Sequence, residues 1–251
     1  MIFFVLSGFL AWQFPCYNTL FAYSYMTYHK ITPYLPHFLA QLEAIDEAFK
    51  LGFNPNQRTQ ILTYLDGLLV WNKTYNLTAI TDPKEAFIKH MMDCLAIVPS
   101  FDTLIAHANL DKVSVLDIGT GAGLPASLLA IARPDWQISA LDSNSKKIRF
   151  IRQMKGELAL TNLTPIHARI EAHSLRYNIV TSRAFASLAD FVAVGQCCLT
   201  ENGRLCAMKG KAPTPTELPK DWHATVIPLT IPELDSERCL VALSRLQDNN
   251  A

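Results

Sequence analysis

An acidic residue followed by three alternating glycines runs from Asp117 to Gly123, in the order Asp-Ile-Gly-Thr-Gly-Ala-Gly. A short apolar run precedes the acid and a stretch of helical length follows the glycines, so we expect a turn between a strand and a helix. Glycines there let a ligand approach the backbone closely, at the carboxyl end of a strand, where a doubly wound sheet forms its crevice. The motif therefore predicts a cofactor site.

The spacing of these glycines distinguishes two classes of cofactor. A dinucleotide-binding turn has the pattern Gly-x-Gly-x-x-Gly, but the position of its third glycine holds Leu124 here. A carboxylate at Asp117 gains nothing beside a pyrophosphate, whereas it suits the ammonium group of a methionine moiety. We therefore expect S-adenosylmethionine, bound by Asp117, Gly119, Gly121 and Gly123. A nicotinamide cofactor and an ordinary tight turn are the alternatives.

Two further positions extend this site along the expected strand ends. Asp142 closes the second strand, where a carboxylate can accept both ribose hydroxyls. Its alternative role is the N-cap of the next helix, which Ser143 or Asn144 could fill instead. Ile170 and Glu171 follow the third strand, where Ile170 could pack on an adenine ring; an ordinary helix start is the alternative there.

Strand-like and helix-like segments alternate through the second half of the chain. Expected strands are 113–117, 137–141, 164–167, 177–181 and 204–208, with helices at 124–132, 145–160 and 188–199. This alternation predicts an α/β fold with a doubly wound, mostly parallel, Rossmann-like sheet. The last two strands, 225–229 and 238–243, have no helix between them, which predicts one antiparallel strand at the edge.

Three helices are expected before the sheet. Apolar residues at helical spacing predict a first helix that ends at Gly52. Asn54-Pro55 and Asp82-Pro83 each combine an N-cap residue with proline at the first helical position, and Glu85 would complete a capping box with Asp82. The third helix is expected to end before Pro99.

The amino terminus has an unusual composition, because residues 1–28 contain no Asp, Glu, Lys or Arg. A signal peptide would need a basic start, and a membrane anchor would need about 20 uninterrupted apolar residues. We favour a third interpretation, a wrongly assigned start codon with translation from Met26, and therefore expect a cytoplasmic protein without a membrane partner. The predicted division is an extension at 1–33 and one domain at 34–251, comprising a helical section at 34–98 and a cofactor-binding core at 99–251.

The charge balance restricts how the protein could bind nucleic acid. The 251 residues carry 22 basic and 22 acidic side chains. This balance excludes a wholly basic protein surface, so any nucleic-acid binding would depend on a local patch of basic residues. The expected helix 145–160 offers such a patch, although a solvated helix surface explains the same charges equally well. Its basic residues are Lys146, Lys147, Arg149, Arg152 and Lys155. Six cysteines without a Cys-x-x-Cys pair predict free thiols in a reducing compartment and no metal site.

Several segments outside the glycine motif point to one protein family. They are Trp71-Asn72-Lys73-Thr74-Tyr75-Asn76-Leu77-Thr78, the pair His90 and Asp93, Leu141-Asp142-Ser143, Lys147-Ile148-Arg149-Phe150, Ser182-Arg183-Ala184-Phe185-Ala186, Lys209-Gly210 and Glu237-Arg238. With the glycine motif, they resemble the bacterial small-subunit rRNA guanine-N7 methyltransferases, once called glucose-inhibited division protein B. The resemblance covers roughly 35–243. The chain departs from the family's usual residues at Cys94, Met208, Lys211 and Cys239.

This resemblance implies a methyltransferase of the S-adenosylmethionine-dependent, Rossmann-like type. Its expected cofactor contacts are Gly119, Leu124, Ile170, Glu171 and Arg183. The implied target is a guanine of 16S rRNA, numbered 527 in the reference bacterial molecule, so the expected partner is 16S rRNA or the small ribosomal subunit. We expect a monomer.

Guanine N7 carries a lone pair and no proton, so its methylation needs no general base and no catalytic acid. A donor to guanine O6 would select this base, and Arg183, Lys209 and Asn76 are the candidates. We expect His90 and Asp93 to meet on one helical face as a structural pair. The main alternative is methylation of a small molecule or a protein, which the zero net charge favours; a membrane-anchored module without enzymatic activity rests on residues 1–28 alone.

Overall fold

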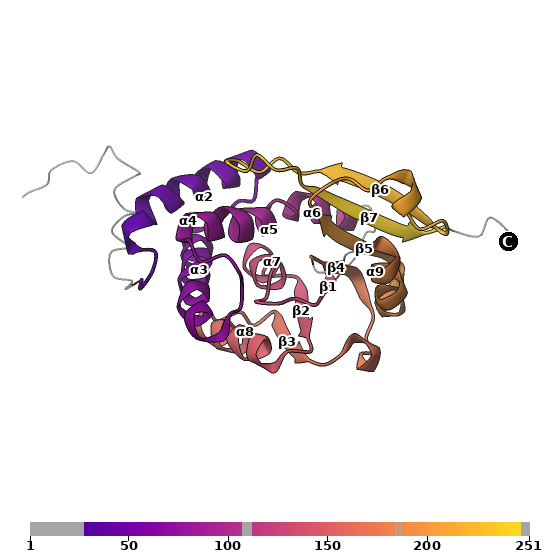
Figure 1. Cartoon of the computed structure of the whole chain (residues 1–251), viewed down its shortest axis with the longest axis horizontal. Coiled ribbons are helices and arrows are strands. Elements are labelled where there is room, and N and C mark those ends of the chain that lie inside the picture. The colour runs from indigo at the N-terminus through magenta and orange to yellow at the C-terminus, as the bar shows by residue number, and fades with distance from the viewer. Residues whose placement is uncertain (1–27, 107–111, 184, 186, 247–251) are drawn as a thin grey trace, which may run out of the picture.

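The computed structural model describes residues 28–106, 112–183, 185 and 187–246; Met26, the proposed start, lies outside this part. The apolar runs of the second half pair into a seven-stranded sheet with the order β3-β2-β1-β4-β5-β7-β6 (Figure 1). The strands are β1 (Ser114–Ile118), β2 (Gln137–Asp142), β3 (Leu163–His167), β4 (Tyr177–Ser182), β5 (Leu199–Lys209), β6 (Trp222–Pro228) and β7 (Cys239–Arg245).

Strands β1 to β5 are mutually parallel, so their carboxyl ends meet at one edge of the sheet. Asp117 of β1 is in register with Ala140 of β2 and with Thr181 of β4. This register places the ends of β1, β2 and β4 side by side, which is where the motifs of the sequence converge.

Helices cover both faces of the sheet. The helices α7 (Ala126–Ala132) and α8 (Ser145–Glu157) pack on one face, and α9 (Leu188–Gly195) packs on the other (Figure 1). The doubly wound α/β architecture is therefore confirmed.

The position of the antiparallel strand differs from the prediction. β7 runs antiparallel to both neighbours and lies between β5 and β6, so the edge strand is β6, which runs parallel to β5. The reason lies in burial: β7 is buried at five of its seven positions, whereas β6 is exposed or half-buried throughout. The more deeply buried strand takes the inner position, and its hairpin partner, which is also largely apolar in sequence, remains at the edge.

The helical section contains more elements than expected. It comprises a 3-10 turn η1 (Thr32–Tyr34), α2 (Leu35–Phe49), α3 (Pro55–Tyr75), α4 (Pro83–Ala86), a π-helical turn η2 (Phe87–Met92), α5 (Asp93–Leu95) and α6 (Val98–Ala106). The third predicted helix thus includes a π-helical turn and ends before Pro99, as expected. Pro99 then falls in the first turn of α6, a helix that was not predicted from the sequence.

The capping signals were partly correct. Asn54 and Gln57 form a reciprocal capping box at the start of α3. At α4, the Asp82 carboxylate accepts the Glu85 backbone N–H, but the Glu85 side chain bonds Lys89 instead of returning to Asp82. The predicted capping box at Asp82 is therefore only half formed.

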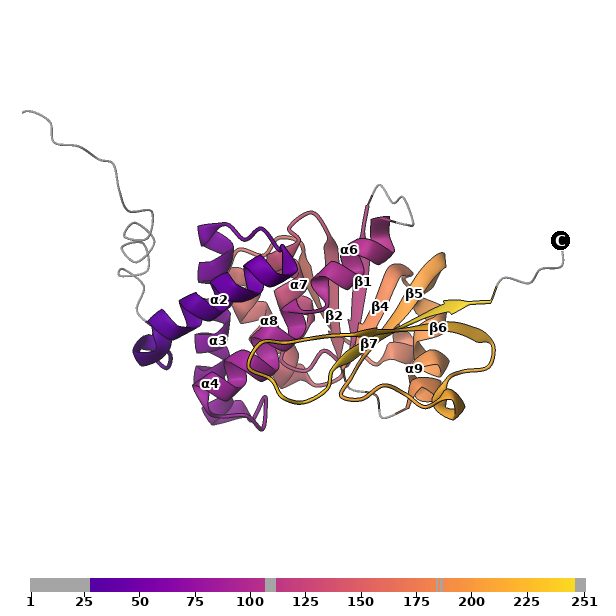
Figure 2. The ribbon, with the colours of Figure 1, turned by 90° about the horizontal axis from the view of Figure 1, so that it is seen from above.

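The helical section and the sheet share one hydrophobic core. Figure 2 shows from above that this section lies beside the sheet. Residues 28–33, predicted to belong to the extension, are part of this fold. Tyr28 and Ile31 are buried, and the Asp66 carboxylate of α3 accepts the backbone N–H groups of residues 29–31 at 2.6 to 3.1 Å. The folded domain thus includes residues 28–33. Within the described ranges, none of the helices combines the length and apolar character that crossing a membrane requires.

Candidate active site

The glycine turn adopts the backbone geometry that its composition suggests. Gly119, Gly121 and Gly123 have positive φ angles of 65°, 61° and 81°, a region that residues with a Cβ rarely adopt. The turn is also fixed to the neighbouring strand, because the Thr120 N–H donates to the carbonyl of Leu141 at 3.1 Å. The turn therefore lies directly above the ends of β1 and β2.

Asp117 lies fully buried beneath this turn. One carboxylate oxygen accepts the Thr120 hydroxyl at 2.5 Å and the Ala126 N–H at 3.2 Å, while the other has no hydrogen-bond partner among the described residues. Burial raises the pKa of Asp117 to about 7, against the opposing effect of those two hydrogen bonds. An orphaned carboxylate oxygen under a glycine turn fits a cofactor that carries an ammonium group.

Asp142 connects the second strand to the same turn. Its carboxylate accepts the Gly121 N–H at 3.0 Å and the Asn144 N–H at 2.8 Å. The N-cap of α8 is Asn144, whose side chain accepts from the first turn of that helix. The capping alternative for Asp142 is thus wrong. Its carboxylate also lies 3.8 Å from the Lys147 ammonium of α8 and retains lone pairs beyond the two hydrogen bonds.

Gly123 has a packing role that the motif alone did not show. A Cβ at this position would lie 2.6 Å from the Ser127 hydroxyl oxygen and 2.7 Å from the Tyr64 hydroxyl oxygen. Tyr64 of α3 donates its hydroxyl to the carbonyl of Ala122 in the turn. Gly123 therefore admits the helical section to the back of the turn, whereas a Cβ on Gly121 would have only the Gly119 carbonyl oxygen nearby, at 4.0 Å.

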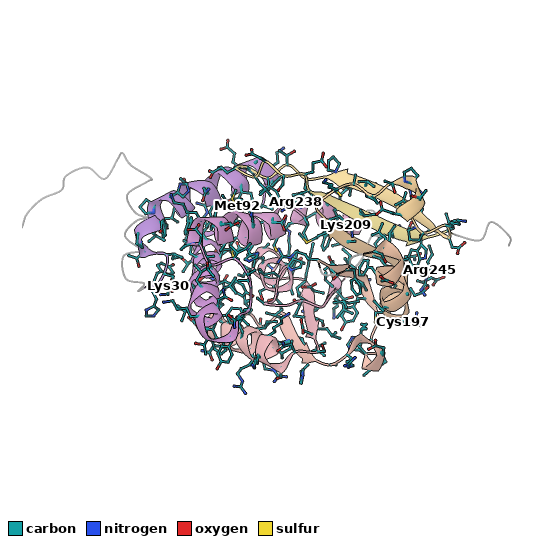
Figure 3. All side chains as sticks on the ribbon, in the orientation of Figure 1. Lys30, Met92, Cys197, Lys209, Arg238 and Arg245 are labelled. Carbon is teal, nitrogen blue, oxygen red and sulfur yellow. The ribbon has the colours of Figure 1, made fainter. Side chains whose placement is uncertain are left out.

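A cavity of about 490 Å³ opens beside the turn. The glycine turn, the helical section, the ends of β4 and β5 and the segment around β6 and β7 all contribute to its wall. The lining residues are Leu77, Thr78, Ile80, Lys89, His90, Asp93, Gly119, Thr120, Gly121, Ala122, Leu124, Arg183, Met208, Lys209, Gly210, Leu229, Arg238 and Cys239. The labels in Figure 3 show Lys209 and Arg238 near one another, beside the helical section.

The charges in this cavity are predominantly positive. Among the described residues that line it, Asp93 is the only carboxylate, and it accepts from Arg183 at 3.3 Å and from Arg238 at 3.1 Å. Lys89 and Lys209 add two further cationic side chains, and the Lys209 ammonium donates to the carbonyl of Phe185 at 3.2 Å. The arrangement suits an anionic or acceptor-rich substrate.

The predicted pairing of His90 with Asp93 is wrong. His90 hydrogen-bonds the Thr78 hydroxyl at 2.8 Å through Nε2, while Asp93 bonds the two arginines. The π-helical turn through Met92 changes the side-chain spacing that an ordinary α-helix would give. Burial, with the charge of Arg183, lowers the pKa of His90 to about 4, so this imidazole is neutral at neutral pH.

The structure gathers only some of the predicted site residues at the cavity wall. Gly119, Gly121, Leu124, Arg183 and Lys209 line it. Two further residues of the wall, Arg238 and Thr78, were not predicted to be site residues and were indicated only as parts of the family resemblance. Their contacts join residues far apart in the chain, for which the sequence holds no local signal.

Other predicted residues lie away from the cavity wall. Asn76 is the left-handed C-cap of α3 and lines a neighbouring cavity instead. Ile170 begins the 3-10 turn η3 (Ile170–Ala172) and packs against the core beneath α9, and Glu171 beside it is exposed. Both lie after β3, so their predicted contacts with an adenine ring remain predictions.

Aromatic and basic side chains lie on α3 and α8. Trp71 stacks on Tyr75 with ring centroids 5.1 Å apart and packs on Phe150 of α8, so these rings form a structural cluster. On α8, the residues Lys146, Arg149 and Arg152 are exposed, and Lys147 and Lys155 are half-buried. The predicted basic face is therefore present.

Comparison with known proteins agrees with this geometry. The family model described as rRNA small subunit methyltransferase G (GidB) matches residues 57–237. The curated ribosomal RNA small subunit methyltransferase G of Psychrobacter cryohalolentis is 54% identical over 215 residues, which is 84% of this chain and 85% of that protein. The Bordetella pertussis protein of the same name is 40% identical over 210 residues, covering 81% of this chain and 91% of that protein.

Among solved structures, the plantazolicin methyltransferase BpumL, in complex with a triazolic desmethylPZN analogue and SAH, superposes with a TM-score of 0.51. It is 8% identical in sequence, over 77% of this chain and 100% of that one, and so shows a shared fold. The expected family is confirmed by the family model and by the two curated relatives. The chain belongs to the ribosomal RNA small subunit methyltransferase G family.

Proposed function

We propose that the protein transfers a methyl group from S-adenosylmethionine to N7 of guanine 527 in 16S ribosomal RNA. The observation that carries this proposal is the cavity beside the glycine turn, which is lined by four cationic side chains and one carboxylate, Asp93, bonded to two of them. Family membership supports the reaction class, since the relatives are named for methylation of small-subunit rRNA.

The cofactor would bind across the glycine turn. Asp142 would accept the ribose hydroxyls, and Ile170 and Glu171 would lie along the adenine. The orphaned oxygen of Asp117, beneath the turn, would attract the ammonium group of the methionine moiety. Arg183, at the cavity wall beside Leu124, would contact the reactive end of the cofactor. The cofactor itself supplies the electrophilic methyl group.

The residues of the cavity are suited to positioning more than to proton transfer. N7 attacks with a lone pair, so no proton has to be removed, and a correctly oriented pair of reactants can gain about 7–11 kcal/mol from proximity. Arg183 and Lys209 line the cavity and would donate to guanine O6, which would distinguish guanine from adenine. His90 is neutral and bonded to Thr78, so its role here is to shape the wall.

The target base has to be accessible from a loop or during assembly. N7 lies on the major-groove edge, and in A-form RNA that groove is too deep and narrow for side chains. The exposed basic face of α8 begins beside Asp142 and would hold the RNA backbone near the cofactor. We further propose that the protein acts as a monomer in the cytoplasm.

A methyl-transfer assay tests this proposal. The purified full chain, incubated with labelled S-adenosylmethionine and small ribosomal subunits or 16S rRNA from cells lacking the gene, should label the RNA. Mapping should place the modification at N7 of guanine 527, and the same modification should be missing from rRNA of those cells. Label that enters only a small molecule or a protein would overturn the RNA substrate while leaving the cofactor assignment intact.

A further inference from the structure

A second cavity lies next to the active site and is not explained by cofactor binding. It measures about 360 Å³ and is lined by Lys30, Leu69, Asn72, Lys73, Asn76, Thr78, Ala79, Thr81 and Pro83. Most of its side chains are hydrogen-bond donors or acceptors, and two lysines are the only charged groups among the described residues that line it. The cavity is thus a polar, cationic hollow formed by the end of α3, the segment 78–83 that follows it and Lys30 before α2.

We propose that this second cavity binds a backbone phosphate of the RNA strand whose guanine enters the active site. The proposal deepens the proposed function and rests on it, because it assigns a subsite for the same substrate. Thr78 lines both cavities, so they are adjacent along one wall. A strand that places a base in the first cavity can therefore place a neighbouring phosphate in the second.

The two lysines form no ion pair that would explain them structurally. Neither Lys30 nor Lys73 forms an ion pair within the described residues, and the nearby Asp66 carboxylate is engaged by the backbone N–H groups of residues 29–31. The sequence of residues 1–28 contains no acidic residue either. No carboxylate is thus available from that segment to neutralise the pair.

The lysines also lie close enough to disturb one another. Contact with Lys73 lowers the pKa of Lys30, with smaller effects from burial and from the repulsion between the two charges, and the negative charge of Asp66 opposes this shift. An anion between them would relieve that repulsion. Figure 3 shows Lys30 beside α3, the helix that carries Lys73 in its last turn.

The structural alternative for Lys73 is weaker than the binding role. A cation in the last turn of α3 interacts favourably with the helix dipole. That role needs one lysine and does not explain why Lys30 lies beside it. Asn76 and Thr81, both exposed at the same cavity, offer polar groups to a phosphate and gain nothing from the dipole.

The experiment compares RNA binding by four proteins as the salt concentration is varied. The full-length wild type is measured beside Lys73→Gln, Lys30→Gln and the control Lys220→Gln, which removes an exposed lysine that lines neither cavity. The probe is 16S rRNA, and the readout is the slope of log Kobs against log salt. Inorganic phosphate, titrated calorimetrically, serves as a second probe.

We expect each cavity variant to bind RNA more weakly, with a salt slope that is smaller by about 0.7 for each phosphate no longer bound. KM for RNA should rise while kcat and the affinity for S-adenosylhomocysteine stay unchanged, and Lys220→Gln should match the wild type. Lys73→Arg should restore much of the binding, because it keeps the charge.

Unchanged slopes in both cavity variants would overturn the phosphate subsite. Loss of inorganic phosphate binding without a change in the RNA slope would also overturn it, since the cavity would then hold a free anion. Should Lys30→Gln fail to fold, the exposed Lys73 provides the test alone. A wild type that methylates no RNA would instead disprove the proposed function, so the two failures are distinguishable.

Discussion

The Asp93 carboxylate of α5 lies 3.3 Å from the Arg183 guanidinium at the end of β4, and this ion pair joins the helical section to the sheet at the wall of the active site. Arg238, before β7, bonds the other oxygen of the same carboxylate at 3.1 Å. One carboxylate therefore fixes two guanidinium groups that come from distant parts of the chain.

Replacing Asp93 should affect both stability and activity. Asp93→Asn would leave two half-buried guanidinium groups without their charged partner, at a cost of about 1–3 kcal/mol of stability.

Arg183→Ala should weaken cofactor binding or turnover while the fold persists, because Asp93 keeps its bond to Arg238. Thermal melts and S-adenosylhomocysteine titrations measure the two effects. An Arg183→Ala protein as active as the wild type would remove Arg183 from the site.

Two glycines of the turn should respond differently to substitution. Gly121→Ala places its Cβ in open space but puts an alanine in a left-handed conformation, which should lower the free energy of unfolding by about 1–2 kcal/mol. Gly121→Val should abolish cofactor binding, because its larger side chain would block the turn. Gly123→Ala should instead lower the melting temperature, because its Cβ would clash with Tyr64 and Ser127. Calorimetry with S-adenosylhomocysteine measures the affinity, and a Gly121→Val protein that binds as tightly as the wild type would contradict the turn as the cofactor site.

The buried Asp117 should make cofactor binding pH-dependent. The pKa of Asp117 is raised to about 7 from the ordinary 3.8. Between these two pH values the folded, cofactor-free protein holds a proton on this carboxyl group that the unfolded chain has already released. Stability from this group is therefore present below about pH 4 and declines as the pH rises through 7. A cofactor ammonium favours the carboxylate, so affinity for S-adenosylhomocysteine should rise between about pH 6 and 8 and then level off.

Calorimetry in buffers of different ionisation enthalpy should detect proton release on binding near pH 6. Asp117→Asn should remove both the release and the pH dependence. His90 affects stability with the opposite sign, because its pKa of about 4 in the folded protein lies below the ordinary 6.5. As the pH falls from 6.5 to 4, the unfolded chain gains a proton on this imidazole and the folded protein does not, so stability decreases. Comparing wild type with Asp117→Asn at each pH separates the two groups. Persistent pH dependence in Asp117→Asn would assign the effect elsewhere.

Asp142 should be more important for the cofactor than for the fold. Asp142→Asn weakens the bond to the Gly121 N–H and removes a charged acceptor, and hydrogen bonds to charged groups contribute about 1.5–3 kcal/mol. We therefore expect the affinity for S-adenosylhomocysteine to fall about tenfold or more. The matched control is Asn144→Ala, which removes the N-cap of α8 and should cost about 1 kcal/mol of stability with unchanged cofactor affinity.

Much of the fold could be predicted from local patterns. Apolar runs ending at Asp117 and Asp142 predicted the central strands, because buried parallel strands have a continuous apolar sequence. The order of the last strands could not be derived, since β6 and β7 differ in burial and not in type. The π-helical turn at 87–92 was also missed, because helical periodicity does not reveal one extra residue per turn.

The site was predictable where it depends on a single segment. The glycine turn follows from backbone geometry that only glycine adopts without cost, so Gly119 and Gly121 could be placed from the sequence. The bonds of Asp93 to Arg183 and Arg238 depend on the packing of α5 against the sheet, which no spacing encodes. The same limit explains why Asn76 was expected at the active site and lies at the neighbouring cavity.

The Tyr64 hydroxyl, in the middle of α3, donates a hydrogen bond to the Ala122 carbonyl. The helical section therefore supports the glycine turn from behind. Occupancy of the turn should consequently be visible as slower amide exchange within α3, on the far side from any bound molecule. Deleting the residues before the sheet to obtain a minimal catalytic unit would remove this support, and the glycine turn would lose its conformation. For this chain, the smallest piece that can hold a cofactor includes the helix that supports the turn from behind.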